Sequence, residues 1–321
     1  MEFRHSCRLT ENTPAADGTV EVDLGTSPIS HLILRLECLN LTADTKATLD
    51  QILGALESFE VLMNGAAVIS LRGMELFRLS GYLCRHEPWQ LNEINLENAV
   101  RSIIMVVPFG RKLFNPNECY PETKSGDLVC KMKVDIDDTG YDGLKLHLEQ
   151  VELPGAKPTR HLKYTEKLIT GGATGEDEVT LPRGNQIAGI MFWATTVPTT
   201  TAWTCDLNDF SLKLNNEEKF YVETYWEALH GAGMLRLSPP VAWSEALLME
   251  NSATAYTQNA DTGVLERVAS DFEHYSFMDF SPNDEDDYLI NSADLGAFSV
   301  RINYGGTGAA RCVPVELKAV G

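Results

Sequence analysis

Several features that mark common protein classes are missing from this chain of 321 residues. It has no run of about 18 apolar residues, so we expect no helix that spans a membrane. Its first residues lack the apolar centre of a secretory signal, so export by that route is not expected. Its seven cysteines are scattered, with no Cys-x-x-Cys pair, which favours free thiols over a disulfide framework or a zinc site.

Basic residues are scarce. Lys and Arg together number 26, against 46 Asp and Glu, and the formal net charge is −20 at pH 7. A field of that sign repels the phosphate backbone that dominates affinity for nucleic acids. We therefore expect no direct contact between this protein and nucleic acid.

Motifs for catalysis are missing as well. The seven histidines form neither a His-x-His nor a His-Glu-x-x-His spacing, which weakens any metal-dependent enzyme class. Two glycine-rich segments, residues 171–175 and 305–308, lack the Lys-Ser/Thr of a phosphate-binding loop and are interpreted as loops between strands. We therefore expect that the protein is not an enzyme and has no catalytic residue. We also expect no cofactor, with calcium bound at subunit contacts as the one alternative.

The strongest local charge feature is the acidic run at residues 283–287. Its carboxylates are Asp284, Glu285, Asp286 and Asp287. Clusters of oxygen ligands suit calcium, but this run lacks the Asp-x-Asp-x-Asp-Gly spacing of a helix-loop-helix site. We interpret it as a solvated loop between strands, with calcium binding at a subunit contact as an alternative.

An internal repeat is what the sequence does contain. Two hairpins show it most clearly, with turn dipeptides at residues 64–65 and 215–216 that tolerate the positive φ of a tight turn. In both hairpins, the apolar alternation requires one extra loop residue or a bulge. The expected core faces are Phe59, Val61, Met63, Ile69 and Leu71 in the first hairpin, and Phe210, Leu212, Leu214, Phe220 and Val222 in the second.

The repeat continues on both sides of the hairpins and predicts seven or eight short strands in each half, as in an antiparallel sandwich or barrel. Helices are few: residues 45–57 predict one without a counterpart, whereas 73–79 and 223–230 follow the hairpins at matching places. The matched segments are 3–10 with 160–170, 20–24 with 178–181, 29–34 with 187–192, 102–109 with 275–282, 127–136 with 294–302, and 144–153 with 311–317.

The two halves meet at residues 153–159, which contain two prolines and a glycine. This composition predicts a short and fairly stiff connector. We predict an N-terminal domain at 1–153, a linker at 154–159 and a C-terminal domain at 160–321. Each half is long enough to bury its own core.

This pattern resembles the double jelly-roll major capsid proteins of icosahedral, membrane-containing viruses. The clearest element is residues 49–79, a helix followed by Phe-Glu-Val-Leu-Met-Asn-Gly and a second short helix. It looks like the first jelly roll of capsid proteins from lipid-containing bacteriophages, the lineage of the tectiviruses and corticoviruses. The resemblance implies an all-β fold of two tandem eight-stranded jelly rolls, with a few short helices in loops.

The resemblance also implies a function. Such a protein is the structural major capsid protein of the virion, assembled in the host cytoplasm into homotrimers that form pseudo-hexameric capsomers. Its partners are neighbouring capsomers, vertex or penton proteins, minor capsid proteins and an internal viral membrane. Long loops at residues 83–99, 111–126 and 238–271 are candidates for outward towers or clasps between subunits. Arg4, His5 and Arg8 could face lipid phosphates, although a solvated terminus is the simpler expectation.

Two other classes stay open. One is a two-domain β-sandwich that binds carbohydrate or acts as an adhesin, for which exposed tryptophans would form the platform. The other is an enzyme built on two jelly rolls, such as a bicupin or an amidase-like hydrolase, which requires a pocket of converging ionisable groups. The candidate platform residues are Trp193, Trp203, Trp226 and Trp243.

Overall fold

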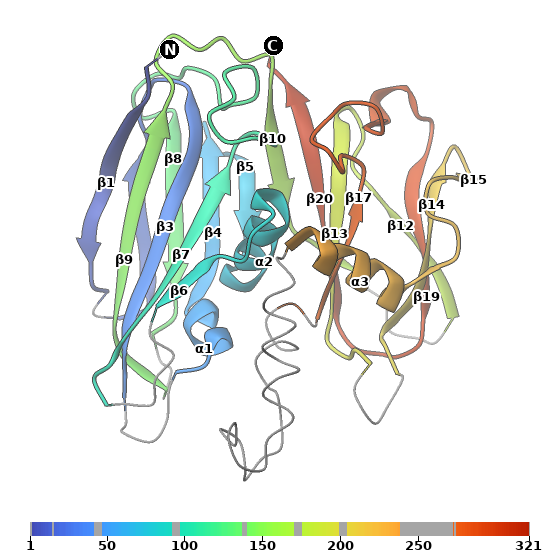
Figure 1. Cartoon of the computed structure of the whole chain (residues 1–321), viewed down its shortest axis with the longest axis horizontal. Helices are drawn as coiled ribbons and strands as arrows, with labels where there is room; N and C mark the ends of the chain where they lie inside the picture. Colours follow the sequence, from blue (N-terminus) through green and yellow to red (C-terminus); the bar gives the residue numbers. More distant parts are fainter. Residues whose placement is uncertain are drawn as a thin grey trace.

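A computed structural model of the chain describes residues 2–14, 16–41, 47–91, 97–136, 140–169, 175–198, 204–237, 272 and 274–320. Two β-sandwiches stand side by side with their strands nearly upright (Figure 1). The N- and C-terminal ends lie at the same end of the molecule (Figure 1). There, the backbone N–H of Val320 donates to the carbonyl of Thr159 at 2.9 Å, which ties the C-terminal end to the predicted linker.

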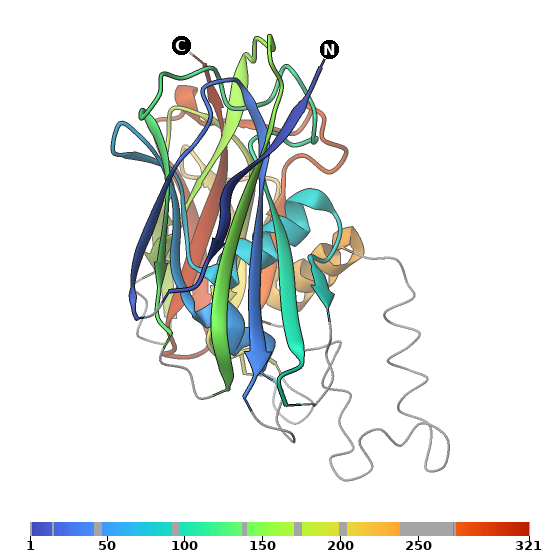
Figure 2. The ribbon, with the colours of Figure 1, turned by 90° about the vertical axis from the view of Figure 1, so that its left-hand side faces the viewer.

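The first sandwich packs two antiparallel sheets face to face. One has the strand order β1-β9-β3-β7-β6, and the strands β5-β4-β8-β2 form the other (Figure 2). The strands are β1 Arg4–Asn12, β2 Gly18–Asp23, β3 Ile29–Asn40, β4 Leu56–Met63, β5 Ala66–Leu71, β6 Trp89–Leu91, β7 Val100–Pro108, β8 Leu128–Val134 and β9 Tyr141–Glu152.

The second sandwich repeats this order. Strands β10-β20-β13-β17 correspond to β1-β9-β3-β7, and β12-β19-β14-β15 correspond to β2-β8-β4-β5. Two such sheets of this connectivity make a jelly roll, so the fold is a double jelly roll. The strands are β10 Arg160–Thr165, β11 Lys167–Ile169, β12 Gly175–Thr180, β13 Gln186–Ala194, β14 Leu207–Leu214, β15 Glu217–Glu218, β16 Thr224–Tyr225, β17 Tyr275–Asp279, β18 Ile290–Asn291, β19 Phe298–Tyr304 and β20 Ala310–Ala319.

Both halves carry a β-bulge at the equivalent point. The register of β3 against β9 shifts between Ile29 and His31, and that of β13 against β20 shifts between Ile187 and Gly189. The alignment of residues 29–34 with 187–192 superposes these two positions. Because bulges are specific features that persist within families, the coincidence supports a common origin of the two halves.

A buried glutamate on the neighbouring strand lies opposite the first residue of each bulge. Glu152 lies opposite Ile29 and also opposite Arg4, whose Nε donates to it at 2.5 Å. Its counterpart Glu316 lies opposite Lys163, whose Nζ donates to it at 3.0 Å. Arg4 and Lys163 are therefore counterparts in the repeat, each neutralising a carboxylate that water does not reach.

The first hairpin is as predicted. Asn64 and Gly65 have φ of 48° and 81°, as a two-residue turn between twisted strands requires. A bulge between Val61 and Leu62 supplies the extra residue, so that Phe59 lies opposite Leu71. The core face predicted for this hairpin is confirmed, with Phe59, Val61, Ile69 and Leu71 buried and Met63 half-buried.

The second hairpin is predicted correctly on one strand and wrongly on the other. Phe210, Leu212 and Leu214 are buried as expected, but Phe220 and Val222 are 57% and 53% exposed. Leu214 pairs with Glu217 and Phe210 pairs with Thr224. These pairs are four residues apart on β14 but seven apart on the returning strand, so the returning strand has three extra residues. The detour between β15 and β16 bends through left-handed backbone at Phe220 and Glu223, with φ of 66° and 46°.

Three helices lie in the connections of the described chain. Helix α1, Leu49–Gly54, is shorter than predicted and begins at a capping box of Thr48 and Gln51; residues 45–46 of the prediction lie outside the described residues. Helices α2, Gly73–Cys84, and α3, Trp226–Leu237, follow the matched hairpins and lie side by side at the junction of the sandwiches (Figures 1 and 2). In the part that the structure describes, none of the helices has the length and apolar character to cross a membrane.

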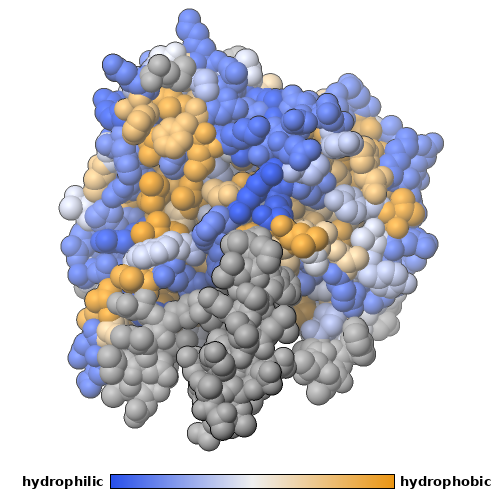
Figure 3. All heavy atoms as spheres, in the orientation of Figure 1, coloured by the Kyte–Doolittle hydropathy of each residue, from blue (hydrophilic) through white to orange (hydrophobic). Residues whose placement is uncertain are grey.

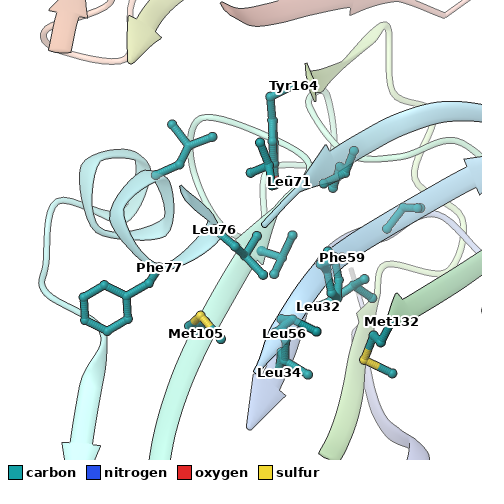
Figure 4. Close-up of a cluster of buried hydrophobic side chains, with 14 of the residues drawn as sticks. Leu32, Leu34, Leu56, Phe59, Leu71, Leu76, Phe77, Met105, Met132 and Tyr164 are labelled. Atoms are coloured by element: carbon teal, nitrogen blue, oxygen red, sulfur yellow. The ribbon is translucent and has the colours of Figure 1, made fainter. Parts of the chain in front are cut away.

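The two cores meet at this junction. The first core draws on both sheets and on α2, and Tyr164 of the second half reaches into it (Figure 4). Tyr164 also lies opposite Ile69 where β10 runs parallel to β5, which joins strands of both sandwiches into one ten-stranded sheet. A second core fills the other sandwich. The fold is therefore two repeated sandwiches fused along one pair of strands.

Phe59 and its counterpart Phe210 test this equivalence. Both side chains are fully buried, so Phe59→Ala and Phe210→Ala should each destabilise the fold by about 3–5 kcal/mol through lost burial and a cavity. Because one sheet spans both halves, each variant should shift a single common unfolding transition. Denaturant unfolding measures this, with Phe3→Ala, at a side chain 62% exposed, as the control. Two separate transitions would contradict it.

Candidate functional site

A network of buried charged side chains lies where the two jelly rolls meet. Arg111 and Glu118 come from the loop between β7 and β8, and their side chains are 5% and 4% exposed. Nε of Arg111 donates to Glu118 at 3.1 Å, and a second guanidinium nitrogen forms an ion pair with the same carboxylate. This pair belongs entirely to the first half of the chain.

The second half binds to that pair at two places. Arg160, at the start of β10, approaches Glu118 at 2.7 Å. Asp286, from the loop between β17 and β18, accepts from Arg111 at 2.6 Å and from Arg160 at 2.7 Å. Arg111 also donates to the hydroxyl of Ser281 at 3.0 Å. The result is a network of two guanidiniums and two carboxylates that bridges the halves.

The charges in this network hold one another ionised. Burial by itself would raise the pKa of Glu118, but the bonds and charge of Arg111, with Arg160, outweigh it and lower that pKa. The hydrogen bond from Arg160 leads the effects that lower the pKa of Asp286. Removing the charge of Glu118 would leave the buried Arg111 to share the single carboxylate of Asp286 with Arg160, which is destabilising because a buried charge loses its nearest partner.

A second ionic contact fastens α2 to the far jelly roll. Arg311 of β20 donates to the buried Glu75 at 2.6 Å and stacks over the ring of Trp193, 4.1 Å from its centroid. Glu166 lies 3.5 Å from Arg311, and its pKa is raised by burial and by the nearby charge of Glu75. Two carboxylates, of Glu75 and Glu166, thus lie beside the guanidinium of Arg311, and the group draws on both halves of the chain.

Aromatic packing completes the junction. Tyr82 of α2 stacks on Phe277 of β17 with ring centroids 4.8 Å apart. Gly233 of α3 lies against Tyr82, where an added Cβ would come within 2.9 Å of the ring. Nε of Arg236 donates to the carbonyl of Tyr82 at 2.8 Å. Close approach of the two helices and these bonds fix one jelly roll against the other.

The acidic run takes part in this junction. The side chain of Asp284 is only 13% exposed and accepts from Arg85 at 2.9 Å, so the interpretation of a solvated loop is wrong at this residue, whereas the other four residues of the run are exposed. The carbonyl of Glu285 accepts from Arg111 at 2.8 Å. Among the described residues, which include Asp287, no group of three or more His, Cys, Asp or Glu side chains is placed to hold a metal ion. Calcium at a contact between subunits stays a prediction.

Arg4, His5 and Arg8 lie together on β1. Arg4 and Arg8 form ion pairs with Glu152, and the ring of His5 lies 2.5 Å from a carboxylate oxygen of Glu149, so these three side chains face acidic residues of β9. Free and buried thiols are the expectation for the seven cysteines, and five of them are buried, whereas Cys84 is half-buried and Cys7 is exposed.

The tryptophans do not form a row in the part of the chain that the structure describes. Trp226 is buried and Trp193 lies under Arg311, while Trp203 and Trp243 lie outside the described residues. Loop 238–271 and residues 171–174 of the first glycine-rich segment also lie outside them. Within the chain, Arg111 and Glu118 of the loop at 111–126 bind the second half. A role of this loop between subunits stays a prediction.

Sequence reasoning missed the junction residues Arg111, Glu118, Arg160, Glu75 and Arg311. None of them stands in a motif, and partners such as Glu75 and Arg311 are far apart along the chain. The one available signal is a charged residue beside apolar ones on a predicted helix, as Glu75 is between Met74 and Leu76.

Comparison with known proteins identifies the fold. No protein-family model matches the chain, and no curated protein matches it. The major capsid protein P2 of bacteriophage PM2 is similar over 100% of this chain and 98% of its own, with a TM-score of 0.64 and 10% identity. The STIV MCP, from Sulfolobus Turreted Icosahedral Virus, is similar over 99% and 97%, with a TM-score of 0.69 and 10% identity. Vp54 of PBCV-1 follows at 98% and 94%, with a TM-score of 0.57 and 8% identity. The chain has the double jelly-roll fold of these major capsid proteins.

The buried network predicts a large effect from a small change. Glu118→Gln keeps the size of the side chain but removes the charge that Arg111 and Arg160 face, and should destabilise the fold by about 3–5 kcal/mol. Glu57→Gln removes an exposed partner of Lys133 and should change stability by about 1 kcal/mol or less. Chemical unfolding of both variants at pH 7 checks this. Equal effects would show that the network does not stabilise the junction.

Two buried histidines predict loss of stability in mild acid. Burial lowers the pKa of both His31 and His161 to about 4, from an ordinary value of 6.5. Between these values the unfolded chain binds protons that the folded chain does not, so stability is full above about pH 6.5 and falls toward pH 4.

Each of these histidines should contribute a loss of about 1.4 kcal/mol per pH unit over that range. His161→Gln should therefore lose less stability than the parent between pH 7.5 and pH 5 in urea unfolding. His86→Gln, at an exposed position, is the matched control and should follow the parent. The same slope in all three proteins would contradict the prediction.

Proposed function

We propose that this chain is the major capsid protein of an icosahedral virus and that its role is structural and not enzymatic. The observation that carries the proposal is structural similarity to two major capsid proteins, which extends over nearly the whole length of this chain and of theirs. Ser/His, Cys/His or metal chemistry is not needed for such a role, whereas a fixed relation between two upright sandwiches is. The junction supplies that relation.

The duplicated architecture suits the tiling of a shell. We propose that three chains associate into a trimer whose six jelly rolls occupy a pseudo-hexagonal outline, since closed symmetric rings are the usual form of homo-oligomers. Two units within one chain can then diverge, so that each meets its own neighbours. In this proposal residues 1–153 and 160–321 are the two domains and 154–159 is the linker.

The wider partners follow from the same proposal. Neighbouring capsomers, vertex or penton proteins and minor capsid proteins would contact the rim of the trimer, and a viral membrane could lie beneath it. A charge of −20 for each chain opposes assembly, so apolar contacts, basic neighbours or calcium at subunit contacts must offset that repulsion. The protein would act in the virion, after assembly in the host cytoplasm.

Oligomeric state tests the proposal most directly. Light scattering after size exclusion should give a mass three times 35.5 kDa, and electron microscopy of the assembled material should show hexagonal capsomers. A persistent monomer that binds glycans on an array would overturn the capsid proposal in favour of a carbohydrate-binding module. If chelation of calcium leaves both assembly and thermal stability unchanged, the proposed role of calcium at subunit contacts is wrong.

A further inference from the structure

An amine and a carboxamide share one buried carboxylate in the second jelly roll. Nζ of Lys163, on β10, donates to Oε1 of Glu316 at 3.0 Å, and Glu316 lies directly opposite it on β20. Nδ2 of Asn185, immediately before β13, donates to Oε2 of the same carboxylate at 2.6 Å. The side chain of Glu316 is 3% exposed. The two oxygens of a single buried carboxylate therefore hold the lysine and the asparagine side by side.

The backbone fixes the positions of these side chains. Strand β20 lies between β10 and β13, so Glu316 has the amine on one side and the amide on the other. The backbone N–H of Ser292 donates to the carbonyl of Asn185 at 3.2 Å, and the hydroxyl of Ser292 donates to the same oxygen. Two groups that are held in one geometry have already lost the freedom that a reaction between them would cost, which removes a large part of its barrier.

The group lies at one end of the second core. Glu316 stands four residues after Cys312 on β20, so both face the same side of the sheet, and Ile187 lies opposite Glu316. Cys312 and Ile187 belong to the second core. On the other side, Lys163 is 28% exposed, and Figure 3 shows mainly hydrophilic side chains where Figure 1 places the beginning of β10 and the end of β20. The carboxylate thus borders an apolar core, while a small product has a way out to water.

The first half has the same arrangement with residues that cannot react with each other. Arg4 and Glu152 take the places of the lysine and the glutamate, and Arg4 donates to Glu152 at 2.5 Å. Ser27 takes the place of Asn185, two residues before the aligned strand segment, and accepts from Arg4 at 3.3 Å. A guanidinium keeps its protons in proteins, and a hydroxyl offers no carbonyl carbon. The carboxylate is common to both halves, whereas the amine and the carboxamide occur together only in the second.

We propose that Lys163 and Asn185 join in an isopeptide bond, with Glu316 as the proton carrier. The lone pair of Nζ attacks Cγ of Asn185, a new C–N bond forms and the bond from Cγ to Nδ2 breaks. Of the three protons on the lysine ammonium, one stays on the new amide. The other two pass through Glu316 to the leaving nitrogen, which departs as ammonium. Atoms and charge balance without an oxidant or a cofactor.

The bond would fasten β10 to β13 across β20, at the end of the molecule where the two halves are connected. A covalent link of this kind stabilises a fold mainly by restricting the unfolded chain, as a disulfide does. The seven cysteines of this chain are free, so the isopeptide bond would be a covalent tie that a reducing compartment does not break. It depends on three residues of one chain and holds whether or not the chain assembles into capsomers.

Mass spectrometry of the folded full chain tests the bond directly. The intact mass should be lower than the mass calculated from the sequence by one molecule of ammonia. Trypsin should not cut after Lys163, and the digest should contain residues 161–167 joined to residues 184–213. A succinimide at the Asn64-Gly65 turn would lose the same mass, so the joined peptide decides between them. Folded protein at its full mass, or ammonia loss that maps to the turn, would overturn the proposal.

Variants separate the bond from the ion pair. Lys163→Arg introduces the cation of the first half and should keep the full mass, with circular dichroism unchanged and a lower Tm than the parent. Glu316→Gln should also keep the full mass, and a joined peptide in this variant would overturn the role of Glu316. Lys213→Arg is the matched control, because Nζ of Lys213 also lies 3.0 Å from a glutamate, Glu178, whose other oxygen accepts from a serine hydroxyl. This control should lose ammonia as the parent does.

Discussion

The parallel contact between β5 and β10 is the constraint on which the rest of the structure depends. Only Tyr164 with Ile69 and Thr165 with Ser70 are paired there, too few to hold two sandwiches at a fixed angle by backbone bonds alone. The buried network around Arg111, the close approach of α2 and α3, and the burial of Tyr164 supply the remaining restraint. A double jelly roll is useful for tiling only if that angle is the same in every copy.

The prediction from sequence succeeded where local chemistry determines structure. The Asn64-Gly65 turn and its bulge are fixed by positive φ and by alternation, both readable along the chain. The same reasoning failed for Phe220 and Val222, because the three-residue detour leaves the apolar pattern unchanged while moving its side chains into water. Apolar residues at a free edge have the same pattern whether they face a core or a partner.

The junction could not be predicted for a different reason. In the sequence, Asp286 is one carboxylate of an acidic run. Its role in bridging the two halves depends on Arg111 and Arg160, which lie in other parts of the sequence. Burial of Glu118 likewise results from the meeting of two halves and has no local pattern. The repeat indicated that two units exist, whereas their mutual orientation is a tertiary property.

The chain ends have a consequence for any layered assembly. Both ends described by the structure lie at one end of the upright strands, beside the connection between the halves (Figure 1). If the molecules stand side by side in a sheet, every amino and carboxyl terminus emerges on the same surface of that sheet. The two surfaces of the layer are then chemically unlike, and a peptide fused to either terminus would be displayed on only one of them.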